Sequence, residues 1–292
     1  MNKKILLVGT VSNVAKTIEK ELKVVLKALS VFDSVQVFLV ESDSTDKTVK
    51  ILDKIALKNR NFEFVALGKL KNKYPNRIAR IAYCRDIYVK YIRDNNVIGK
   101  WDYVVVADLD GMNFKLRKNG IQSCFETNVD WDGVMANQKF GYYDIYALRA
   151  PGWVEEDCFI SMSRSKMISQ QPNISNKYLI NFLVQFNYFD KFRKKYIYDQ
   201  MKIIKNKNLF VKVDSAFGGL AIYKPIVFLN SLYSTDKATQ SEHVYFHKTS
   251  DNANRSFYIN PKLINNFFNP YNINKSYFIR FIREFIKFTK LI

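Results

Sequence analysis

Short apolar runs alternate with amphipathic segments through the first third of the chain. Four runs have the length and the β-branched content typical of strands, at 4–8, 35–40, 62–67 and 103–107. Residues 14–29 and 46–57 instead place apolar side chains near the 3.6-residue spacing of a helix. Strands that alternate with helices predict an α/β fold, with a mostly parallel central sheet covered by helices on both faces.

The rest of the chain has a less regular pattern. Residues 111–160 are rich in Gly, Asn, Tyr and Trp, which predicts loops and short strands. Residues 174–208 have a helical and basic pattern, and residues 209–224 return to strand character around a Gly-Gly turn. Residues 275–292 contain a predicted basic amphipathic helix, whose apolar side carries mainly Phe and Ile.

Composition sets the broad class of protein. With 292 residues, 48% of them hydrophobic, the chain can bury a large core. Its net charge of +19, from 46 Lys and Arg against 27 Asp and Glu, suits a phosphate-rich partner or an anionic membrane surface. General overuse of lysine explains the same net charge, so only clustered charge is informative.

Cysteine spacing and apolar run lengths indicate the compartment. Cys84, Cys124 and Cys158 are isolated in sequence, which indicates neither a disulfide framework nor a zinc site and is typical of a reducing environment. The first apolar run is too short for a signal peptide, and no stretch reaches the roughly 18 apolar residues of a membrane-spanning helix. We therefore expect a cytoplasmic protein.

An Asp-x-Asp pair follows the fourth predicted strand. In VVVADLD, Asp108 and Asp110 lie at the strand end, and ligands bind at the carboxyl edge of open α/β sheets. Two carboxylates there suit a hard divalent cation that also binds a substrate diphosphate. The alternative is that Asp108 caps a loop and Asp110 begins an Asp-Gly turn. A second pair, Asp130 and Asp132, follows no apolar run, so the first pair is the metal candidate.

The segment VESDSTDKT follows the second predicted strand. Ser44 or Thr45 suits a helix N-cap, and Asp46 suits the positive end of the helix. Capping does not explain Glu41 and Asp43, which at this sheet edge suit hydrogen bonds to ribose hydroxyls or base edges. No G-x-G-x-x-G motif follows the first strand, which disfavours a dinucleotide site.

The predicted helix RIARIAYCRDIYVKYI carries a charge on its apolar stripe. Arg85 occupies that stripe, and an unpaired guanidinium in the core is costly. One interpretation is a structural ion pair with Asp86 or Asp102. The other is that Arg85, together with Arg77 or Arg80, clamps a diphosphate, for which the planar guanidinium is suited.

Two short segments add polar candidates in the second half. His243 and His247 in SEHVYFH are four residues apart, and would share one face of either a helix or a strand. With Glu242 beside it, His243 is a candidate third metal ligand, although a lone histidine is more often structural. The acidic turn of PGWVEEDCF, which contains Glu156 and Asp157, either holds a general base or is solvated.

Taken in order, these motifs resemble those of GT-A glycosyltransferases, in particular the group related to capsule-associated α-1,3-mannosyltransferases. The resemblance covers most of residues 4–250. It rests on the motifs GTVSNV, VESDSTDKT, RIARIAYCRD, VVVADLDGMN, WDGVMANQKFGYYDIYALR, DSAFGGLAIY and SEHVYFH. Asp86 stands where this group has Asn, and ESD stands where it has END, so the nucleoside contacts differ there.

We expect a GT-A glycosyltransferase domain over residues 1–250, with a nucleotide-binding half at 1–110. The acceptor half, 111–250, would contain a helical insertion near 174–208, and 251–292 would form a tail with the basic helix. The implied donor-binding residues are Thr10, Glu41, Asp43, Arg80, Arg85, Asp108, Tyr143, Asp144 and Arg149. The implied metal ligands, for Mn²⁺ or Mg²⁺, are Asp108, Asp110 and His243. The catalytic candidates are Glu156, Asp157 and Glu242.

The resemblance implies an enzyme that moves a sugar from a UDP- or GDP-linked donor to a hydroxyl of a surface glycan or lipid-linked glycan. Metal and arginines would stabilise the leaving diphosphate while a carboxylate deprotonates the acceptor. Retention and inversion of anomeric configuration are both open. The basic helix either packs on the domain or lies on the anionic inner face of a membrane.

Two alternatives belong to other classes. A basic nucleic-acid-binding protein would use the 18 Tyr and 23 Phe for stacking, but these fall at buried-looking positions and no recognised binding module occurs, so we do not expect nucleic acid as a partner. A metal-dependent nucleotidyltransferase would use the same paired carboxylates and would release pyrophosphate.

Overall fold

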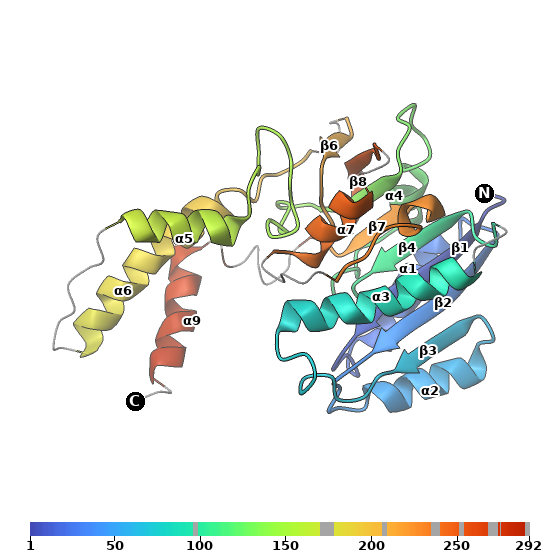
Figure 1. The fold of residues 1–292 in the computed structure, drawn as a ribbon, viewed down its shortest axis with the longest axis horizontal. Coiled ribbons are helices and arrows are strands. Elements are labelled where there is room, and N and C mark those ends of the chain that lie inside the picture. Colours follow the sequence, from blue (N-terminus) through green and yellow to red (C-terminus); the bar gives the residue numbers. More distant parts are fainter. Residues whose placement is uncertain are drawn as a thin grey trace.

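The computed structural model describes residues 1–95, 99–169, 178–205, 209–234, 240–250, 254–267, 274 and 276–289. Within these residues an eight-stranded sheet forms the centre of the molecule (Figure 1). Its strands are β1 (Lys4–Val11), β2 (Ser34–Glu41), β3 (Phe62–Ala66), β4 (Tyr103–Ala107), β5 (Gly133–Gln138), β6 (Val211–Val213), β7 (Leu220–Tyr223) and β8 (Phe257–Asn266).

The sheet has a parallel half and a mixed half. The strand order is β3-β2-β1-β4-β7-β5-β8-β6, in which β3, β2, β1 and β4 run parallel. β7 enters between β4 and β5 and is antiparallel to both. β8 is parallel to β5, and β6 is antiparallel to β8. The expected α/β fold with a mostly parallel sheet is confirmed.

Helices cover both faces of the sheet, as the alternating pattern predicted. α1 (Ile18–Leu29), α2 (Thr48–Lys58) and α4 (Lys118–Gln122) pack on one face, and α3 (Arg77–Asn95) and α7 (Glu242–Ser250) pack on the other. Successive strand residues alternate between the two cores, because side chains in a strand point to opposite faces. Burial on both faces explains why these strands are continuous apolar runs in the sequence.

A helical module stands beside the sheet (Figure 1). It consists of α5 (Cys158–Ile168), α6 (Tyr178–Arg193) with the π-helix Lys194–Tyr198 that continues it, and α9 (Tyr277–Thr289). The helices predicted within 174–208 and 275–292 are therefore present, although the described residues between Asp199 and Lys205 are not helical.

Aromatic packing and one buried ion pair join α9 to α6. The ring of Phe182 on α6 lies with its centroid 4.7 to 6.0 Å from the rings of Phe281, Phe285 and Phe288 on α9. Arg280 of α9 donates two hydrogen bonds to the carboxylate of Asp190 on α6, at 2.5 and 2.6 Å. One side of the amphipathic C-terminal helix thus packs within the module.

The second half differs from the sequence-based expectation at one boundary. β8 lies inside the sheet beside β5, so the sheet extends past the boundary expected at residue 250, and 251–292 is more than a tail. The two strands within 209–224 lie apart in the sheet, because β6 pairs with β8 whereas β7 pairs with β4 and β5. Both arrangements arise from long-range strand pairing, which local patterns do not specify. In the described part of the chain, no helix combines the length and the apolar content needed to cross a membrane.

Candidate active site

A cavity of about 660 Å³ opens at the carboxyl edge of the parallel half of the sheet. The end of β1 contributes Thr10, the chain after β2 contributes Asp43, and the chain after β4 contributes Asp108 and Asp110. Helices α3 and α7, residues 143–146 and the helical module complete the lining. The volume lies within the range of about 300–1,000 Å³ that is usual for small-ligand sites. The Asp-x-Asp pair after β4 therefore lies where the strand pattern placed it, against a ligand-sized cavity.

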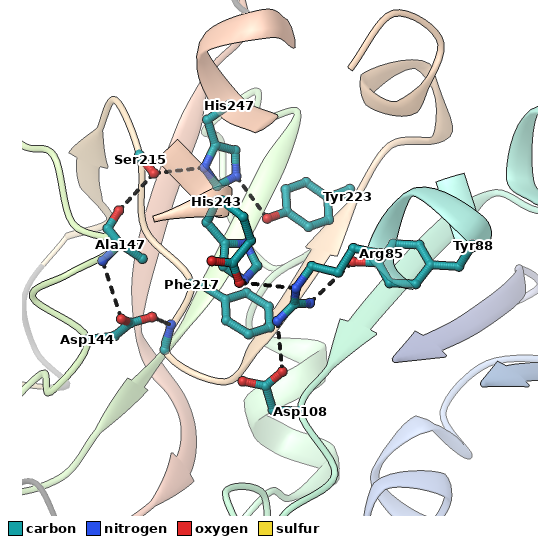
Figure 2. A network of polar contacts seen from close by, with 12 residues as sticks. Arg85, Tyr88, Asp108, Asp144, Ala147, Ser215, Phe217, Tyr223, His243 and His247 are labelled. Atoms are coloured by element: carbon teal, nitrogen blue, oxygen red, sulfur yellow. Dashed lines mark hydrogen bonds and ion pairs between the residues drawn. The ribbon is translucent and has the colours of Figure 1, made fainter. Parts of the chain in front are cut away.

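Arg85 of α3 joins two acidic side chains that line the cavity (Figure 2). Its Nη2 lies 3.0 Å from Oδ1 of Asp108, and its Nε lies 3.3 Å from Oε1 of Glu242 on α7. Nη1 donates to the hydroxyl of Tyr88 at 3.2 Å. Arg85 is only 3% exposed, so the prediction that a guanidinium on this stripe needs partners is confirmed.

The two partners considered from the sequence do not pair with Arg85. Asp86 accepts hydrogen bonds from the backbone N–H groups of residues 233–234, and Asp102 pairs with a lysine near the N-terminus. α7 explains the difference, because it brings Glu242, which is 157 residues away in sequence, onto the guanidinium. Spacing along one helix cannot reveal such a contact.

Burial and neighbouring charges set the ionisation of these groups. Burial, followed by the negative charge of Asp108, raises the pKa of Asp110 to about 6. Burial lowers the pKa of Arg85, but Tyr88, Asp108 and Glu242 together raise it well above the ordinary value, so this guanidinium stays charged. A cation beside Asp110 would relieve the repulsion between the two aspartates.

Glu21 of α1 holds the loop that follows the Asp-x-Asp pair. Its carboxylate accepts the backbone N–H of Gly111 at 2.5 Å and that of Asn113 at 2.7 Å. The side-chain amide of Asn113 in turn donates to the carbonyl oxygen of Asp108 at 2.5 Å. Because Glu21 is fully buried, burial raises its pKa to about 7, against the lowering effect of these hydrogen bonds. Glu21 therefore fixes the path of the chain through Asp110.

Sequence reasoning missed Glu21, although a signal for it exists. Glu21 lies three residues after Ile18 on the apolar stripe of α1, which is the pattern that identified Arg85 on α3. Phe217 was also missed. Its ring contacts Arg85, with the guanidinium carbon 5.2 Å from the ring centroid, and nothing in its local sequence distinguishes it from a core residue.

Asp43 and Glu41 have different surroundings, although both follow β2. Asp43 lines the cavity and pairs with Arg80, with Nε 3.2 Å from Oδ2, while its Oδ1 accepts the backbone N–H of Lys71. Glu41 is 2% exposed and accepts the backbone N–H of Ser44 at 3.0 Å. Glu41 thus shapes the loop and Asp43 faces the cavity, which separates two residues that the sequence treated as equivalent.

Tyr143 and Asp144 line the cavity from the segment after β5. Oδ2 of Asp144 accepts the backbone N–H of Gly218 at 3.1 Å, and burial raises the pKa of Asp144 to about 6. Gly218 and Gly219 both have positive φ, and the carbonyl of Gly219 accepts the backbone N–H of Asp108 at 3.0 Å. The Gly-Gly segment before β7 therefore connects the Asp144 carboxylate to the Asp-x-Asp motif.

Both histidines lie on helix α7, which settles the choice between helix and strand. His247 is fully buried between two hydroxyl groups, each 2.9 Å from a ring nitrogen, and burial lowers its pKa to about 3 (Figure 2). His243 lines the cavity and stacks on Phe217, with ring centroids 3.8 Å apart. Within the described residues, neither nitrogen of His243 has a hydrogen-bond partner. His247 is therefore a structural residue, whereas both ring nitrogens of His243 are buried, with Nε2 3.9 Å from Oε1 of Glu242.

Asp108 and Asp110 fit a metal better than the expected three-residue set does. Among the described residues no group of three His, Cys, Asp or Glu side chains is arranged to hold a metal, so His243 does not complete a site with the two aspartates. Burial and the charge of Arg85 lower the pKa of His243 well below its ordinary value, which indicates that a second cation is unfavourable there. Two carboxylates still suit Mg²⁺ or Mn²⁺, which proteins often hold through one or two carboxylates and substrate phosphates.

Three remaining candidates do not line the cavity. Asp157 caps the first turn of α5 by accepting the N–H groups of residues 159–160, and it forms a buried ion pair with Arg149 at 3.0 Å. Glu156 pairs with Arg164 at 2.6 Å on the surface. The acidic turn therefore begins a helix, and the interpretation as a solvated turn describes Glu156 but not Asp157, which is buried.

The second Asp-x-Asp pair has a structural environment. Asp130 and Asp132 both pair with Lys224, at 2.8 and 3.6 Å. Asp132 also accepts the backbone N–H of Ser256. The pair links the ends of neighbouring strands and lies outside the cavity lining.

No protein-family model matches the sequence, and no curated protein matches it. Among solved structures, TarS residues 1–349 of S. aureus in complex with UDP-GlcNAc is 13% identical, with a TM-score of 0.48. The mannosyltransferase PcManGT of Pyrobaculum calidifontis, in complex with GDP-Man and Mn²⁺, is 11% identical, with a TM-score of 0.46. Glucosyl-3-phosphoglycerate synthase of Mycobacterium tuberculosis, in complex with UDP, is 13% identical, with a TM-score of 0.34.

The aligned regions include most of this chain and a smaller share of the other chains. They cover 94% of this chain and 61% of the TarS chain, and 91% and 57% for the mannosyltransferase. For the synthase they cover 79% of this chain and 59% of the other. The chain thus spans about three fifths of the length of the structures that it matches.

Proposed function

We propose that this protein is a metal-dependent GT-A glycosyltransferase, which moves a sugar from a nucleoside diphosphate to an acceptor hydroxyl. The observation that carries the proposal is the pair Asp108 and Asp110 at the end of β4, in a 660 Å³ cavity that also contains Arg77, Arg80 and Arg85. A diphosphate needs positive charge on several sides, and guanidinium groups with one divalent cation supply it. Asp108 and Asp110 alone would repel a diphosphate, so a bound cation is needed to offset their negative charge.

The donor would lie with its nucleoside toward β1 and β2 and its diphosphate toward the arginines. Thr10 and Asp43 line the first region, and Asp43 suits hydrogen bonds from ribose hydroxyls. A bound Mg²⁺ or Mn²⁺ would neutralise charge on the departing diphosphate. Arg85 stays positively charged in its buried position and provides a fixed charge that needs no reorganisation during the reaction.

Asp144 and Glu242 are the carboxylates that we assign to the acceptor. The acceptor oxygen forms a bond to the anomeric carbon, the bond from that carbon to the diphosphate oxygen breaks, and the diphosphate leaves with the electron pair. The acceptor proton passes to a carboxylate. Asp144 is suited to this role because a carboxyl with a pKa of about 6 is ionised at neutral pH and is a stronger base than an ordinary aspartate. Glu242 is already paired with Arg85, so its carboxylate is less available to an acceptor hydroxyl.

Exposed side chains of the helical module favour an acceptor that lies at a membrane surface. Phe278, Ile282 and Ile286 of α9 are 68, 39 and 48% exposed, and they repeat at helical spacing. Arg283 and Lys287 on the same helix are also exposed, which suits anionic lipid headgroups. We assign a peripheral position on the inner face of the membrane, with a surface glycan or lipid-linked glycan as acceptor. Sedimentation with anionic vesicles tests this assignment, and a Phe278→Ser, Ile282→Ser variant that binds them as wild type does would remove it.

Calorimetric titration of UDP, GDP and CMP, with and without Mn²⁺, tests the central proposal. We expect one diphosphate to bind with metal present, and Asp110→Asn to weaken that binding at least about tenfold. Asp130→Asn is the matched control, because it alters the other Asp-x-Asp pair outside the cavity, and it should bind as wild type does. Equal binding by both variants, or no binding by wild type, would contradict the proposal. Release of pyrophosphate from a nucleoside triphosphate would instead identify a nucleotidyltransferase.

A further inference from the structure

A second hollow lies between helices α6 and α9 of the helical module. It has a volume of about 300 Å³, and four phenylalanines form much of its lining, namely Phe182, Phe186, Phe189 and Phe288. We call it the aromatic groove. Its apolar character contrasts with the cavity at the sheet edge, where carboxylates and guanidinium groups predominate. Exposure of aromatic surface to water is unfavourable. An apolar ligand that covered the groove would therefore bind with a favourable free energy.

The aromatic groove adjoins the candidate active site. Arg193 of α6 and Glu284 of α9 line both hollows, with Nη1 of the arginine 3.7 Å from Oε1 of the glutamate. Both side chains are partly exposed, so the pair is a polar junction between an apolar and a charged compartment. On the groove side, Oδ1 of Asn181 is buried and has no hydrogen-bond partner in the part of the chain that the structure describes.

We propose that the aromatic groove binds the apolar chain of an amphiphilic acceptor, so that the acceptor is a glycan linked to a long-chain lipid phosphate. This inference rests on the proposed function, because it assigns the sugar end of the acceptor to the cavity. A molecule that occupies both hollows must be polar at one end and apolar at the other. The guanidinium of Arg193 lies where the two ends meet, which suits an anionic phosphate link there.

The exposed surface of the module is consistent with this route. Leu179, Ile180 and Leu183 of α6 are 53, 44 and 36% exposed, as is part of the apolar surface of α9. A module seated on a bilayer through these side chains could take up a lipid chain directly from the acyl region, without moving that chain through water. The groove is therefore a binding site for one chain, and the surrounding surface is the contact with the membrane.

Two tryptophan substitutions on α6 test the inference. Gln185 lines the groove and is exposed, so Gln185→Trp fills the groove with little expected effect on folding. Leu183→Trp is the matched control, because Leu183 is also exposed on α6 but does not line the groove. The probes are farnesyl phosphate below its micelle concentration and inorganic phosphate, each titrated into the full chain. Titration of UDP and GDP with Mn²⁺ serves as a separate readout of the cavity.

Wild type and Leu183→Trp should bind farnesyl phosphate at least about tenfold more tightly than inorganic phosphate, and Gln185→Trp should lose that difference. Phe189→Gln, which makes the groove polar without filling it, should give the same loss. The inference would be overturned if all variants bound farnesyl phosphate equally, or if Gln185→Trp and Leu183→Trp lost the same affinity for it. Either result would indicate general adsorption to the surface. Nucleotide binding should be unchanged in every variant. Its absence from wild type would contradict the proposed function, while the farnesyl phosphate result would still decide whether the groove binds a chain.

Discussion

The guanidinium of Arg85 lies 3.0 Å from the carboxylate of Asp108, so a buried cation is paired with the first aspartate of the Asp-x-Asp motif. This contact gives the two aspartates different charge environments. Asp108 is partly neutralised by the protein itself, whereas the pKa of Asp110 is raised by burial and by the charge of Asp108. Asp110 is therefore the aspartate that gains most from an added cation.

Removal of Arg85 should destabilise the fold. Arg85→Met leaves Asp108 and Glu242 without their shared cation, and loss of one partner of a buried pair costs about 3–5 kcal/mol. Urea unfolding should therefore show a decrease of that size in the free energy of unfolding. Arg77→Met, at an exposed position on the same helix, is the control and should change it by less than about 0.5 kcal/mol. Similar values for the two variants would contradict the structural role of Arg85.

Glu21 should make stability depend on pH. Its pKa in the folded protein, about 7, is above the ordinary value of 4.5, so ionisation favours the unfolded chain. The contribution of this group is complete below pH 4.5 and is lost as the pH rises to about 7. The loss is about 3 kcal/mol from a shift of this size. In Glu21→Gln, which keeps an acceptor oxygen, the free energy of unfolding should therefore fall less between pH 5 and about 8 than in wild type.

The control for this effect is Glu19→Gln, which alters an exposed glutamate on the same helix. It should retain the wild-type pH dependence of unfolding. If Glu21→Gln also retains it, the Glu21 carboxyl does not titrate in the range assigned here. Donor binding should weaken in the Glu21 variant as well, since the loop through Asp110 loses part of its support.

Asp144 should control the pH dependence of sugar transfer. Its pKa is about 6 because of burial, so the fraction of ionised base, and with it the rate, should rise with pH through that value. In Asp144→Asn the rate should fall by about 10²–10⁴-fold. The rise in rate with pH near 6 should also be absent from the pH–rate profile of this variant. If the rise in rate near pH 6 is unchanged in this variant, the titrating group would instead be Asp110, whose pKa is also about 6.

The ion pair between Arg280 and Asp190 should hold α9 on α6. Both side chains are buried, and Arg280→Met would leave the Asp190 carboxylate without its cation. We expect the variant to be cleaved within α9 in limited proteolysis, under conditions in which wild type stays intact. Arg283→Met, at an exposed position of the same helix, should resist cleavage as wild type does. Cleavage of both variants at equal rates would show that the aromatic contacts alone hold the helix.

The sequence specified the parallel half of the sheet well and the mixed half poorly. β1 to β4 are apolar runs separated by helices, and parallel strands joined by helices form the order β3-β2-β1-β4. The position of β7 between β4 and β5 depends on contacts between segments far apart in the chain. The same reason limited the site: Asp108 and Asp110 were identified from a strand end, but the contact of Glu242 with Arg85 required the complete fold.

The placement of β7 also bears on how the proposed activity could diversify. Gly218 holds Asp144 and Gly219 holds Asp108, so the backbone turn before one short strand sets the separation of the carboxylates assigned to donor and acceptor. That turn is separate in the chain from the segments after β1 and β2, which would recognise the nucleoside. Exchange of those segments, whether by evolution or by design, can therefore alter which molecules are joined while the distance over which they react stays constant.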